Sequence, residues 1–524
     1  MPKFEHHRYQ LGYMIQEAAQ RDPTVPIVLD KPLGINPRLG KSLLVGDLAE
    51  IVETFAGQLY RAGVRPGDRV AVYKTNNADI MAIACALSRV RAVPVLLSPL
   101  LPADAAARLI SRAGPRYVLT DSKKIEAGEL DSELIEESGA SVLLTSGSYG
   151  DLTTVTDLES APIPEFGPID PTAPCVITHT SGTTREPKLV EQNTQGLGTH
   201  ITLQLRIANA LRVRERWALC VSFVHIRTYS ALGVGLSRRM PFAFLVDHDV
   251  DTVRDVFTRF RPGLVETHPN TFIRWESLAD DPARPLSSAR YYINTFDAIH
   301  PRTVRVLLAA SDHRFPLYFQ AYGQTESGPV TVRIYTRRGA ERANGRCVGY
   351  PIPGLTGVRL RNGRKGLSPI EIRSRGRAIT YLGEENLFAS QVDGVWWDMG
   401  DVGYRGRWGC VHLLDRAIDH IEGLNSVLEI EDKLMSRLPE LREIILVPKG
   451  DHTIQPIICT KTDSPLDSAV WQQAVQDLPP MAEPVQCTWE DLPQTATSKV
   501  KRVELQKIVQ QDALPTLGMR PPAN

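Results

Sequence analysis

The chain has 524 residues, with 60 Lys and Arg against 60 Asp and Glu, so its formal net charge is zero. This length predicts more than one folded unit, and 42% apolar residues with 23% charged residues exclude disorder over most of the chain. A neutral chain has no basic excess with which to neutralise a phosphate backbone, which argues against nucleic acid as a partner.

The cysteines and the apolar runs restrict the class of protein further. There are 7 cysteines, an odd number without a C-x-x-C pair, which argues against a disulfide framework and against a structural zinc site. No apolar run approaches the ~18–20 residues that cross a bilayer, and the start of the chain lacks the apolar core of a secretion signal. We therefore expect a cytoplasmic enzyme or binding protein without a membrane span.

The first 120 residues alternate between helical and strand patterns. A helix is predicted to open at Asp47, which would cap it, and to end at Gly63; a short buried strand follows at residues 70–73. Helices near 79–91 and 103–113 then lead to strands near 93–97 and 117–119. Strands alternating with helices indicate crossover units and a largely parallel sheet.

The pattern of predicted elements changes after residue 160. Residues 161–174 are rich in proline and read as an extended connector. After about residue 345, short strand patterns separated by Gly and Arg predict a smaller β-rich subdomain. From about residue 417 helix and strand patterns resume, with a strand at 444–447 and a helix near 466–477.

A polar loop follows the apolar run at residues 175–177. It reads HTSGTTREPK from His179 to Lys188, and its N–H groups and hydroxyls could converge on phosphate oxygens, with the lysine adding charge. The loop lacks the G-x-x-x-x-G-K-[ST] pattern, which excludes the usual nucleotide-triphosphate loop. A plain polar surface turn is the competing interpretation.

Three further segments follow in order: AYGQTE from Ala321, WWDMGDVG from Trp396 with Asp415-Arg416 after it, and LPQTATSKVKR from Leu492. Together with the TSGTT-x-x-PK loop, they resemble the signature motifs of the adenylate-forming superfamily. This family includes acyl-CoA synthetases, the adenylation domains of peptide synthetases and luciferases, and it joins a carboxylate to AMP with release of pyrophosphate. The resemblance covers nearly the whole chain.

The resemblance implies an α/β fold of two domains. Residues 1–416 are expected to hold two sheet-and-helix subdomains and a β subdomain, and to bind ATP and substrate. Residues 417–524 are expected to form a small, mobile α+β lid that carries the catalytic lysine. ATP would lie at the junction of the two domains.

The matching residues also receive expected roles. Lys499 would bridge the acid and the α-phosphate as the catalytic lysine, with Lys501 as the weaker candidate; Thr325 would reach the α-phosphate, and Glu326 would hold Mg²⁺. Tyr322 and Gly323 would receive adenine, and Asp401 and Arg416 the ribose. The β- and γ-phosphates would lie against Thr180, Ser181, Gly182, Thr183, Thr184 and Lys188.

The chain departs from the family pattern in two places that bear on the substrate. The segment NTFDA, residues 294–298, stands where the family has paired glycines, so larger side chains would narrow the acid pocket. We expect Phe296, Asp297 and His225 to line this pocket, although His225 and the nearby His268 could equally be structural. The stretch after Arg416 is shorter than the family's, and Ile418 stands at the hinge, which questions thioester chemistry.

Three functions remain open from the sequence. The first is ATP- and Mg²⁺-dependent adenylation of a small aromatic carboxylic acid, followed by transfer to a thiol such as coenzyme A or a carrier protein, in secondary metabolism. The second is a family member with a non-thiol acceptor: an amide-forming ligase with an amine acceptor, or an ATP-dependent diazotase that activates nitrite for an amino-aryl acid. The third is a catalytically dead homologue that serves as a binding module.

Overall fold

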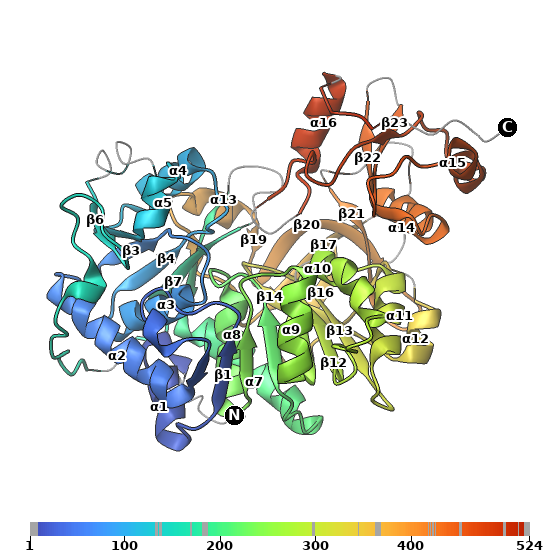
Figure 1. Ribbon diagram of the computed structural model, residues 1–524. Helices are drawn as coiled ribbons and strands as arrows, with labels where there is room; N and C mark the ends of the chain where they lie inside the picture. The colour runs from blue at the N-terminus through green and yellow to red at the C-terminus, as the bar shows by residue number, and fades with distance from the viewer. Residues whose placement is uncertain are drawn as a thin grey trace.

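The computed structural model describes residues 9–130, 135, 139–167, 170–180, 187–295, 299–343, 345–361, 368–417, 419, 421, 424, 426–449, 453–495, 499–511 and 513–517. A large body holds the N-terminal and central parts of the chain, and a smaller lobe, orange to red in Figure 1, packs on one side of it. The expected mixed α/β architecture, with a large N-terminal part and a smaller C-terminal part, is confirmed. The boundary at residue 416 stays a prediction.

The first sheet of the body contains the predicted crossover units. Its strand order within the described residues is β18-β8-β7-β4-β3-β5-β6, and the contacts between β7, β4, β3, β5 and β6 are parallel. Short apolar strands between helices require this arrangement, as the sequence predicted. The strands are β3 (Arg69–Val72), β4 (Val93–Leu96), β5 (Tyr117–Thr120), β6 (Ser141–Leu144), β7 (Pro174–His179), β8 (Leu189–Asn193) and β18 (Thr380–Tyr381).

The second sheet is longer and runs into the β-rich subdomain. Its parallel centre is β10-β9-β11-β12-β13, while β14 and β15 continue it in antiparallel fashion toward β21, β20, β17 and β16. The strands are β1 (Pro26–Leu29), β2 (Ser42–Leu44), β9 (Trp217–Cys220), β10 (Phe242–Phe244), β11 (Leu264–Thr267), β12 (Tyr291–Asn294), β13 (Leu317–Gln324), β14 (Gly328–Tyr335), β15 (Cys347–Pro351), β16 (Thr356–Leu360), β17 (Ser368–Ser374), β19 (Val392–Asp393), β20 (Trp396–Arg405) and β21 (Val411–Arg416).

Side chains that alternate along the strands divide the body into layers. On β9, Trp217 and Leu219 join a core shared with the first sheet, whereas Ala218 and Cys220 join a core on the opposite face. Helices therefore lie both between the sheets and outside them. Those between are α1 (Leu11–Arg21), α2 (Val45–Arg61), α3 (Asp79–Arg89), α7 (Thr194–Ala210) and α8 (Ile226–Ser237).

The outer helices cover the remaining faces of the two sheets. The first sheet is covered by α4 (Ala103–Ala113) and α5 (Ser122–Glu126). The second is covered by α9 (Val250–Phe260), α10 (Pro269–Arg274), α11 (Pro301–Ala310) and α12 (Arg337–Glu341), while α13 (Glu385–Ser390) packs on the β-rich part. Short 3₁₀ turns occur at η2 (Pro37–Leu39), η3 (Val155–Asp157) and η4 (Trp275–Ala279).

The predicted start of the helix at Asp47 was wrong by two residues. Helix α2 begins at Val45, and the Asp47 carboxylate, in its first turn, accepts a hydrogen bond from the Leu44 N–H at 2.7 Å. Asp47 therefore satisfies an unpaired amide from inside the helix rather than from the capping position. The helix ends at Arg61, and the predicted stop, Gly63, follows two residues later with a φ of 101° that suits a helix C-terminus.

The C-terminal lobe is built on a small sheet of its own, in the order β22-β23-β24. Two apolar clusters, one on each side of this sheet, hold the helices of the lobe. Figure 1 places the lobe beside β20 and β21 and above α10. Its elements are α14 (Val427–Arg437), β22 (Leu441–Pro448), β23 (Ile454–Thr460), α15 (Ser468–Val475), β24 (Val485–Gln486) and α16 (Arg502–Gln510).

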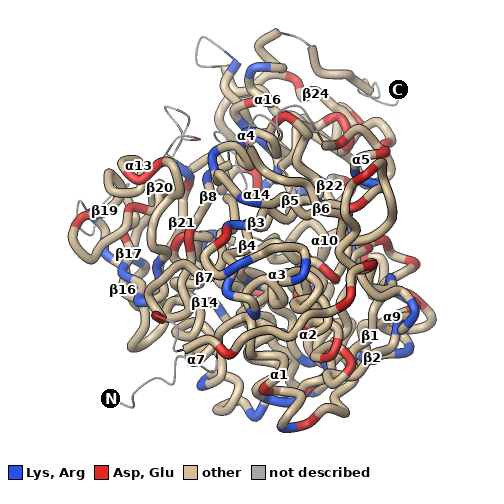
Figure 2. The backbone as a smooth tube through the Cα atoms, turned by 90° about the vertical axis from the view of Figure 1, so that its left-hand side faces the viewer, with Lys and Arg blue, Asp and Glu red and all other residues tan. Residues whose placement is uncertain are grey.

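Charges of both signs are dispersed over the molecule. Figure 2 shows Lys and Arg interspersed with Asp and Glu on the side that bears α1, α2 and α3. Among the described residues, no helix combines the length and the apolar character needed to cross a bilayer.

Candidate active site

A cleft of about 260 Å³ lies between the body and the C-terminal lobe. Body strands contribute Tyr322, Gly323, Asp401 and Arg416 to its wall, and the lobe contributes Lys499. Side chains far apart in the sequence, taken from three of the four motifs, thus converge on one cavity. Junctions between domains are a usual place for ligands.

Tyr322, Asp401 and Arg416 form a connected group in this cleft. The Tyr322 hydroxyl donates to Asp401 Oδ2 at 2.5 Å, and Arg416 Nε lies 3.7 Å from Asp401 Oδ1. Burial, followed by the nearby Asp401 carboxylate, raises the pKa of Tyr322 well above its usual value, so the hydroxyl stays a donor. Adjacent strands hold the pair, because Asp401 and Arg416 are register partners of β20 and β21.

Gly323 and Thr325 shape the turn that follows Tyr322. The β13–β14 register shifts between Tyr322 and Gly323, and a Cβ on Gly323 would lie 2.0 Å from the Gly328 carbonyl oxygen. Only glycine allows this close approach of the two strands. Thr325 opens the following turn, and its carbonyl accepts from Gln192 Nε2 at 2.8 Å, which ties the turn to β8.

Glu326 lies in the same turn and is buried, with 6% of its surface exposed. Its carboxylate accepts from the Tyr381 hydroxyl at 2.5 Å, and Lys188 Nζ lies 4.9 Å from the centre of the Tyr381 ring. Tyr381 therefore connects the predicted metal ligand with the lysine of the phosphate loop. The sequence analysis missed Tyr381, whose position next to β8 depends on a strand pair distant in sequence.

The phosphate loop connects the antiparallel strands β7 and β8, whose register pairs His179 with Leu189. Its two ends are closed by Thr180 and Lys188: the Thr180 N–H donates to the Lys188 carbonyl, and the Lys188 N–H donates to Thr180 Oγ1, both at 3.0 Å. The predicted phosphate ligands Ser181, Gly182, Thr183 and Thr184 lie outside the described residues.

The C-terminal segment presents Lys499 to the cleft and keeps Lys501 away from it. The Lys499 carbonyl accepts from the Thr495 N–H at 2.8 Å, which ties the backbone of the lysine to Thr495. Lys501 Nζ instead forms an ion pair with Glu504 at 3.0 Å in the first turn of α16. Of the two candidate lysines, the geometry favours Lys499.

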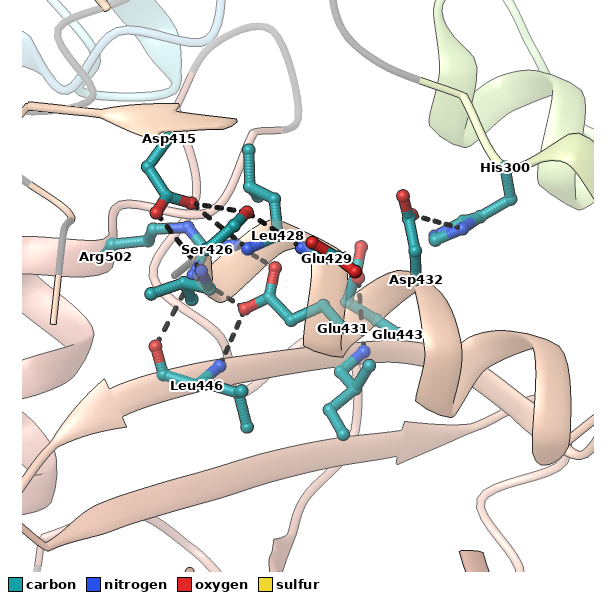
Figure 3. Close-up of polar contacts among 12 residues, drawn as sticks. His300, Asp415, Ser426, Leu428, Glu429, Glu431, Asp432, Glu443, Leu446 and Arg502 are labelled. Carbon is teal, nitrogen blue, oxygen red and sulfur yellow. Dashed lines mark hydrogen bonds and ion pairs between the residues drawn. The ribbon is translucent and has the colours of Figure 1, made fainter. Parts of the chain in front are cut away.

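Polar contacts orient the lobe that carries this lysine (Figure 3). Asp415 caps α14 by accepting from the N–H groups of Val427 and Leu428, each at 3.1 Å. Glu431 binds the Arg502 guanidinium through both oxygens, at 2.8 and 2.7 Å. Arg502 begins α16, three residues after Lys499, so this ion pair fixes the segment that bears the lysine.

Asp432 connects the lobe with the body. Arg346 Nη2, beside β15, lies 2.7 Å from Asp432 Oδ2, and His300 Nδ1, before α11, lies 3.1 Å from Asp432 Oδ1. Figure 3 shows His300 reaching from the body toward Asp432 of α14. The pair of contacts joins two body segments to one lobe carboxylate.

His225 and His268 directly precede the helices α8 and α10 as their N-cap residues. His225 Nδ1 accepts from the Arg227 N–H at 3.1 Å at the start of α8, so the neutral ring carries its proton on Nε2. Burial lowers the pKa of His225 to about 3, and burial likewise lowers that of His268 well below the usual value. Both imidazoles are therefore uncharged at neutral pH.

An apolar cavity of about 120 Å³ adjoins the cleft, because Thr295 and Ala321 line both. Its volume is close to the ~150 Å³ of an engineered cavity that holds benzene, so one aromatic ring fits. The predicted pocket residues Phe296 and Asp297 follow Thr295 directly but lie outside the described residues, and His225 is two residues from Arg227 in the cavity wall.

A buried ion pair stands at the wall of this apolar cavity and was missed by the sequence analysis. Arg227 donates to both oxygens of Glu266, with Nη2 at 2.7 Å, and its Nη1 contacts Gln204 and Ser230. Arg227 is 7% exposed and Glu266 0%. In the sequence, Arg227 and Glu266 each stand as a single charged residue within a mainly apolar segment. The sequence does not show that these two segments meet.

Residues 15–376 match the family described as AMP-binding enzyme. The chain is 44% identical to the 3-amino-2-hydroxy-4-methoxybenzoate diazotase of Streptomyces cremeus, with 96% of each chain covered. It is 27% identical to the 3-aminoavenalumate diazotase of a Streptomyces species, with 79% of this chain and 75% of the relative covered.

The fold matches solved structures over nearly the whole chain. The O-succinylbenzoate coenzyme A synthetase of Bacillus subtilis, in complex with ATP and magnesium ion, aligns with a TM-score of 0.77 at 18% identity. The alignment covers 94% of this chain and 98% of that one. Sequence motifs, cleft geometry and family match agree, and the chain belongs to the AMP-binding enzymes, the adenylate-forming superfamily.

Proposed function

We propose that this enzyme uses ATP to activate nitrite and diazotises an aromatic amine that carries a carboxylate. The observation that carries the proposal is the 44% identity to a diazotase over 96% of both chains. The apolar cavity beside the cleft supports it, because its volume suits one aromatic ring and leaves little room for a long acyl chain.

In this proposal the nucleotide lies in the cleft between body and lobe. Tyr322 and Gly323 receive adenine, Asp401 and Arg416 hold the ribose hydroxyls, and the loop from Thr180 to Lys188 holds the outer phosphates. Thr325 and Lys499 face the α-phosphate, where charge develops when pyrophosphate leaves. Support comes from the connected contacts of Tyr322, Asp401 and Arg416 and from the convergence of three motifs on one cavity.

Glu326 fits the role of magnesium ligand, because it offers a buried hard oxygen donor beside the Lys188 end of the phosphate loop. Bound Mg²⁺ would neutralise charge on the triphosphate. Tyr381 would hold the Glu326 carboxylate in place through its hydroxyl.

The chemistry requires two displacements. A nitrite oxygen attacks the α-phosphorus, the bond to pyrophosphate breaks, and a mixed anhydride of nitrite and AMP forms. The aromatic amine then attacks the nitrosyl nitrogen and loses a proton, and AMP leaves with its oxygen. The resulting N-nitrosamine rearranges to a diazo hydroxide, which takes up a proton and loses water to give the diazonium ion. Both displacements depend on positioning and charge neutralisation rather than on a protein nucleophile.

Arg227 would bind the aromatic partner in the cavity. A guanidinium has five N–H donors, and four of those of Arg227 bind Glu266, Gln204 and Ser230. Among the described residues, one Nη2 donor is therefore left for a ligand. A carboxylate or phenolic oxygen on the ring is the acceptor that this donor would prefer.

The alternative is adenylation of an aromatic acid followed by transfer to coenzyme A. The structural likeness to a coenzyme A synthetase at 18% identity shows the fold alone, and does not distinguish the acceptor. The alternative therefore depends on the sequence motifs, which the two chemistries share.

A single assay separates the two functions. AMP release is measured with ATP and Mg²⁺ on a panel of aminobenzoates, with and without nitrite, and with and without coenzyme A. Nitrite-dependent AMP release, with a diazonium trapped as an azo dye, is the expected result. Release of AMP that requires coenzyme A and proceeds without nitrite would overturn the proposal.

A further inference from the structure

Three side chains that can bind a metal meet where β15 pairs with β21, the strand that carries Arg416 of the cleft wall. The sulfur atoms of Cys347 and Cys410 and a ring nitrogen of His412 all lie within 4.8 Å of one another. Cys410 Sγ is 3.3 Å from His412 Nε2, and both cysteines are buried, at 1% and 8% exposure. None of the three has a role in the proposed reaction.

The strand register brings these residues together. Cys347 and His412 are direct partners in the antiparallel pair of β15 and β21, and Cys410 precedes β21 by one residue. A tight turn holds Cys410 in place, with the Gly406 N–H donating to the Cys410 carbonyl at 2.8 Å. Because Cys410 and His412 are two positions apart, their side chains share a face.

The space in front of two of these ligand atoms is kept open by Gly406. A Cβ at this position would lie 2.8 Å from both Cys410 Sγ and His412 Nε2. The backbone at Gly406 does not have a positive φ, so its conformation does not require glycine. The absence of a side chain instead leaves room beside a sulfur and a nitrogen that face the same point.

Neighbouring groups orient two of the ligands as they do around known metal centres. Arg333 Nη1 donates to Cys347 Sγ, a contact that fixes the position of this sulfur. The Tyr404 ring stacks on His412, with the ring centres 4.7 Å apart and an angle of 14° between the planes, which fixes the imidazole. Such outer contacts hold metal ligands in a preferred orientation.

We propose that Cys347, Cys410 and His412 bind one Zn²⁺ ion, with a water molecule as the fourth ligand. Two sulfurs and one imidazole nitrogen are the donors that zinc prefers in tetrahedral sites. On binding, each thiol releases a proton and a Zn–S bond forms, without any change of oxidation state. The ion would join β15 to the hairpin of β20 and β21, the strands that present Asp401 and Arg416 to the cleft.

The structure also explains why spacing in the sequence argued against a zinc site. The ligands come from a C-x-H segment and from a cysteine on a strand that is distant in the sequence. No C-x-x-C pair is needed, because the β15–β21 register supplies the third ligand.

Metal content of the full-length enzyme tests the proposal. The protein is incubated with Zn²⁺ at neutral pH under reducing conditions, desalted, and analysed for bound zinc; Co²⁺ replaces Zn²⁺ in a parallel sample for absorption spectra. One zinc per chain and a thiolate-to-cobalt absorption band are expected. Less than about 0.1 equivalent of zinc in the wild-type enzyme would overturn the proposal directly, without reference to any variant.

Variants assign the ion to the three residues. Cys410→Ser, Cys347→Ser and His412→Gln should each lower bound zinc at least tenfold, with folding checked by circular dichroism. The matched control is the double variant Cys459→Ser and Cys487→Ser, because these two lobe cysteines also form a close pair, with sulfurs 3.7 Å apart. Full zinc in Cys410→Ser, or equal loss in the control, would contradict the assignment, as would a disulfide between Cys347 and Cys410 under the reducing conditions.

Discussion

At the scale of single residues, the proposed chemistry depends on one ammonium group placed at the cleft by the lobe. Lys499 lines the cleft with Tyr322 and Asp401, while Lys501 pairs with Glu504 outside it. The two lysines are two positions apart, yet of the two only Lys499 lines the cleft. This difference allows a matched comparison.

We predict that Lys499→Ala lowers nitrite-dependent AMP release by at least about 100-fold, the range seen when a charge-stabilising group is lost. ATP binding, measured by calorimetry, should change little, because the other nucleotide contacts remain. Lys501→Ala should keep nearly wild-type turnover. Equal loss in both variants, or normal turnover in Lys499→Ala, would show that the lysine has no role in activation.

The ion pair of Arg227 and Glu266 is the second feature that depends on single residues. Removing one partner of a buried ion pair leaves an unpaired charge, which destabilises the folded state. An apolar pair of similar volume does not destabilise it in this way. We predict that Arg227→Met and Glu266→Met each destabilise the protein by about 3–5 kcal/mol, whereas the double variant loses less than their sum. Unfolding in urea measures these differences.

The same double variant tests the role of Arg227 in substrate binding. If Arg227 holds a polar substituent of the aromatic ring, the folded double variant should show a KM for the amino-aryl acid raised at least tenfold. The KM for ATP should remain within about twofold, because the cleft is not altered. An unchanged KM for the aromatic partner would leave the pair with a structural role alone.

At the scale of elements, β22 carries a carboxyl group in surroundings that disfavour its charge. Burial raises the pKa of Glu443 to about 7, above the ~4.3 of an unfolded chain. Between these values the folded state binds a proton that the unfolded state does not, so stability falls as the pH rises through this window. The contribution is fully present below about pH 4 and lost above about pH 7.

We therefore predict that Glu443→Gln stabilises the enzyme at pH 8 relative to the wild type, and has less effect at pH 5. Urea unfolding at both pH values gives the comparison. Glu440, which lies just before β22 and is exposed, supplies the control as Glu440→Gln. A difference between wild type and Glu443→Gln that does not depend on pH would refute this account.

Local patterns allowed the crossover units to be predicted, and long-range contacts explain what was missed. The strands at residues 70–73, 93–97 and 117–119 and the helices between them followed from apolar spacing, which acts within one element. The continuous second sheet did not follow, because β14 and β15 pair through Thr331 with Pro351 and Val332 with Tyr350. Register between strands depends on tertiary packing that periodicity does not report.

Some residues of the candidate site were likewise predictable from sequence motifs, and others were not. Tyr322, Asp401, Arg416 and Lys499 belong to recognisable motifs, and the structure places them around one cleft. Tyr381, the Arg227–Glu266 pair and the cluster of Cys347, Cys410 and His412 belong to none. Each of these depends on two or three segments meeting in space, so no single stretch of sequence indicates it.

At the scale of the whole molecule, the position of Lys499 depends on how the lobe docks on the body. Asp432 receives contacts from Arg346 and His300 of the body, and Lys461 Nζ of the lobe lies 3.3 Å from Glu276 of the body. Family members with two half-reactions move such a lobe between orientations. The Asp432 contacts would then stabilise the orientation in which Lys499 faces the nucleotide.

We predict that Asp432→Asn lowers turnover about tenfold, because a docking contact worth about 1.4 kcal/mol changes an equilibrium by that factor. ATP affinity should fall less, since most of the proposed nucleotide contacts lie on the body, and proteolysis between body and lobe should become faster. Asp477→Asn is the matched control, because Asp477 pairs with Arg437 of the same lobe, at 2.5 Å. If both variants lose turnover equally, the effect lies in the lobe itself; if Asp432→Asn keeps full turnover, the docked orientation does not depend on this carboxylate. We expect slower turnover together with faster proteolysis in Asp432→Asn alone. This combination follows only if the Asp432 carboxylate holds the lobe in the orientation that places Lys499 over the body.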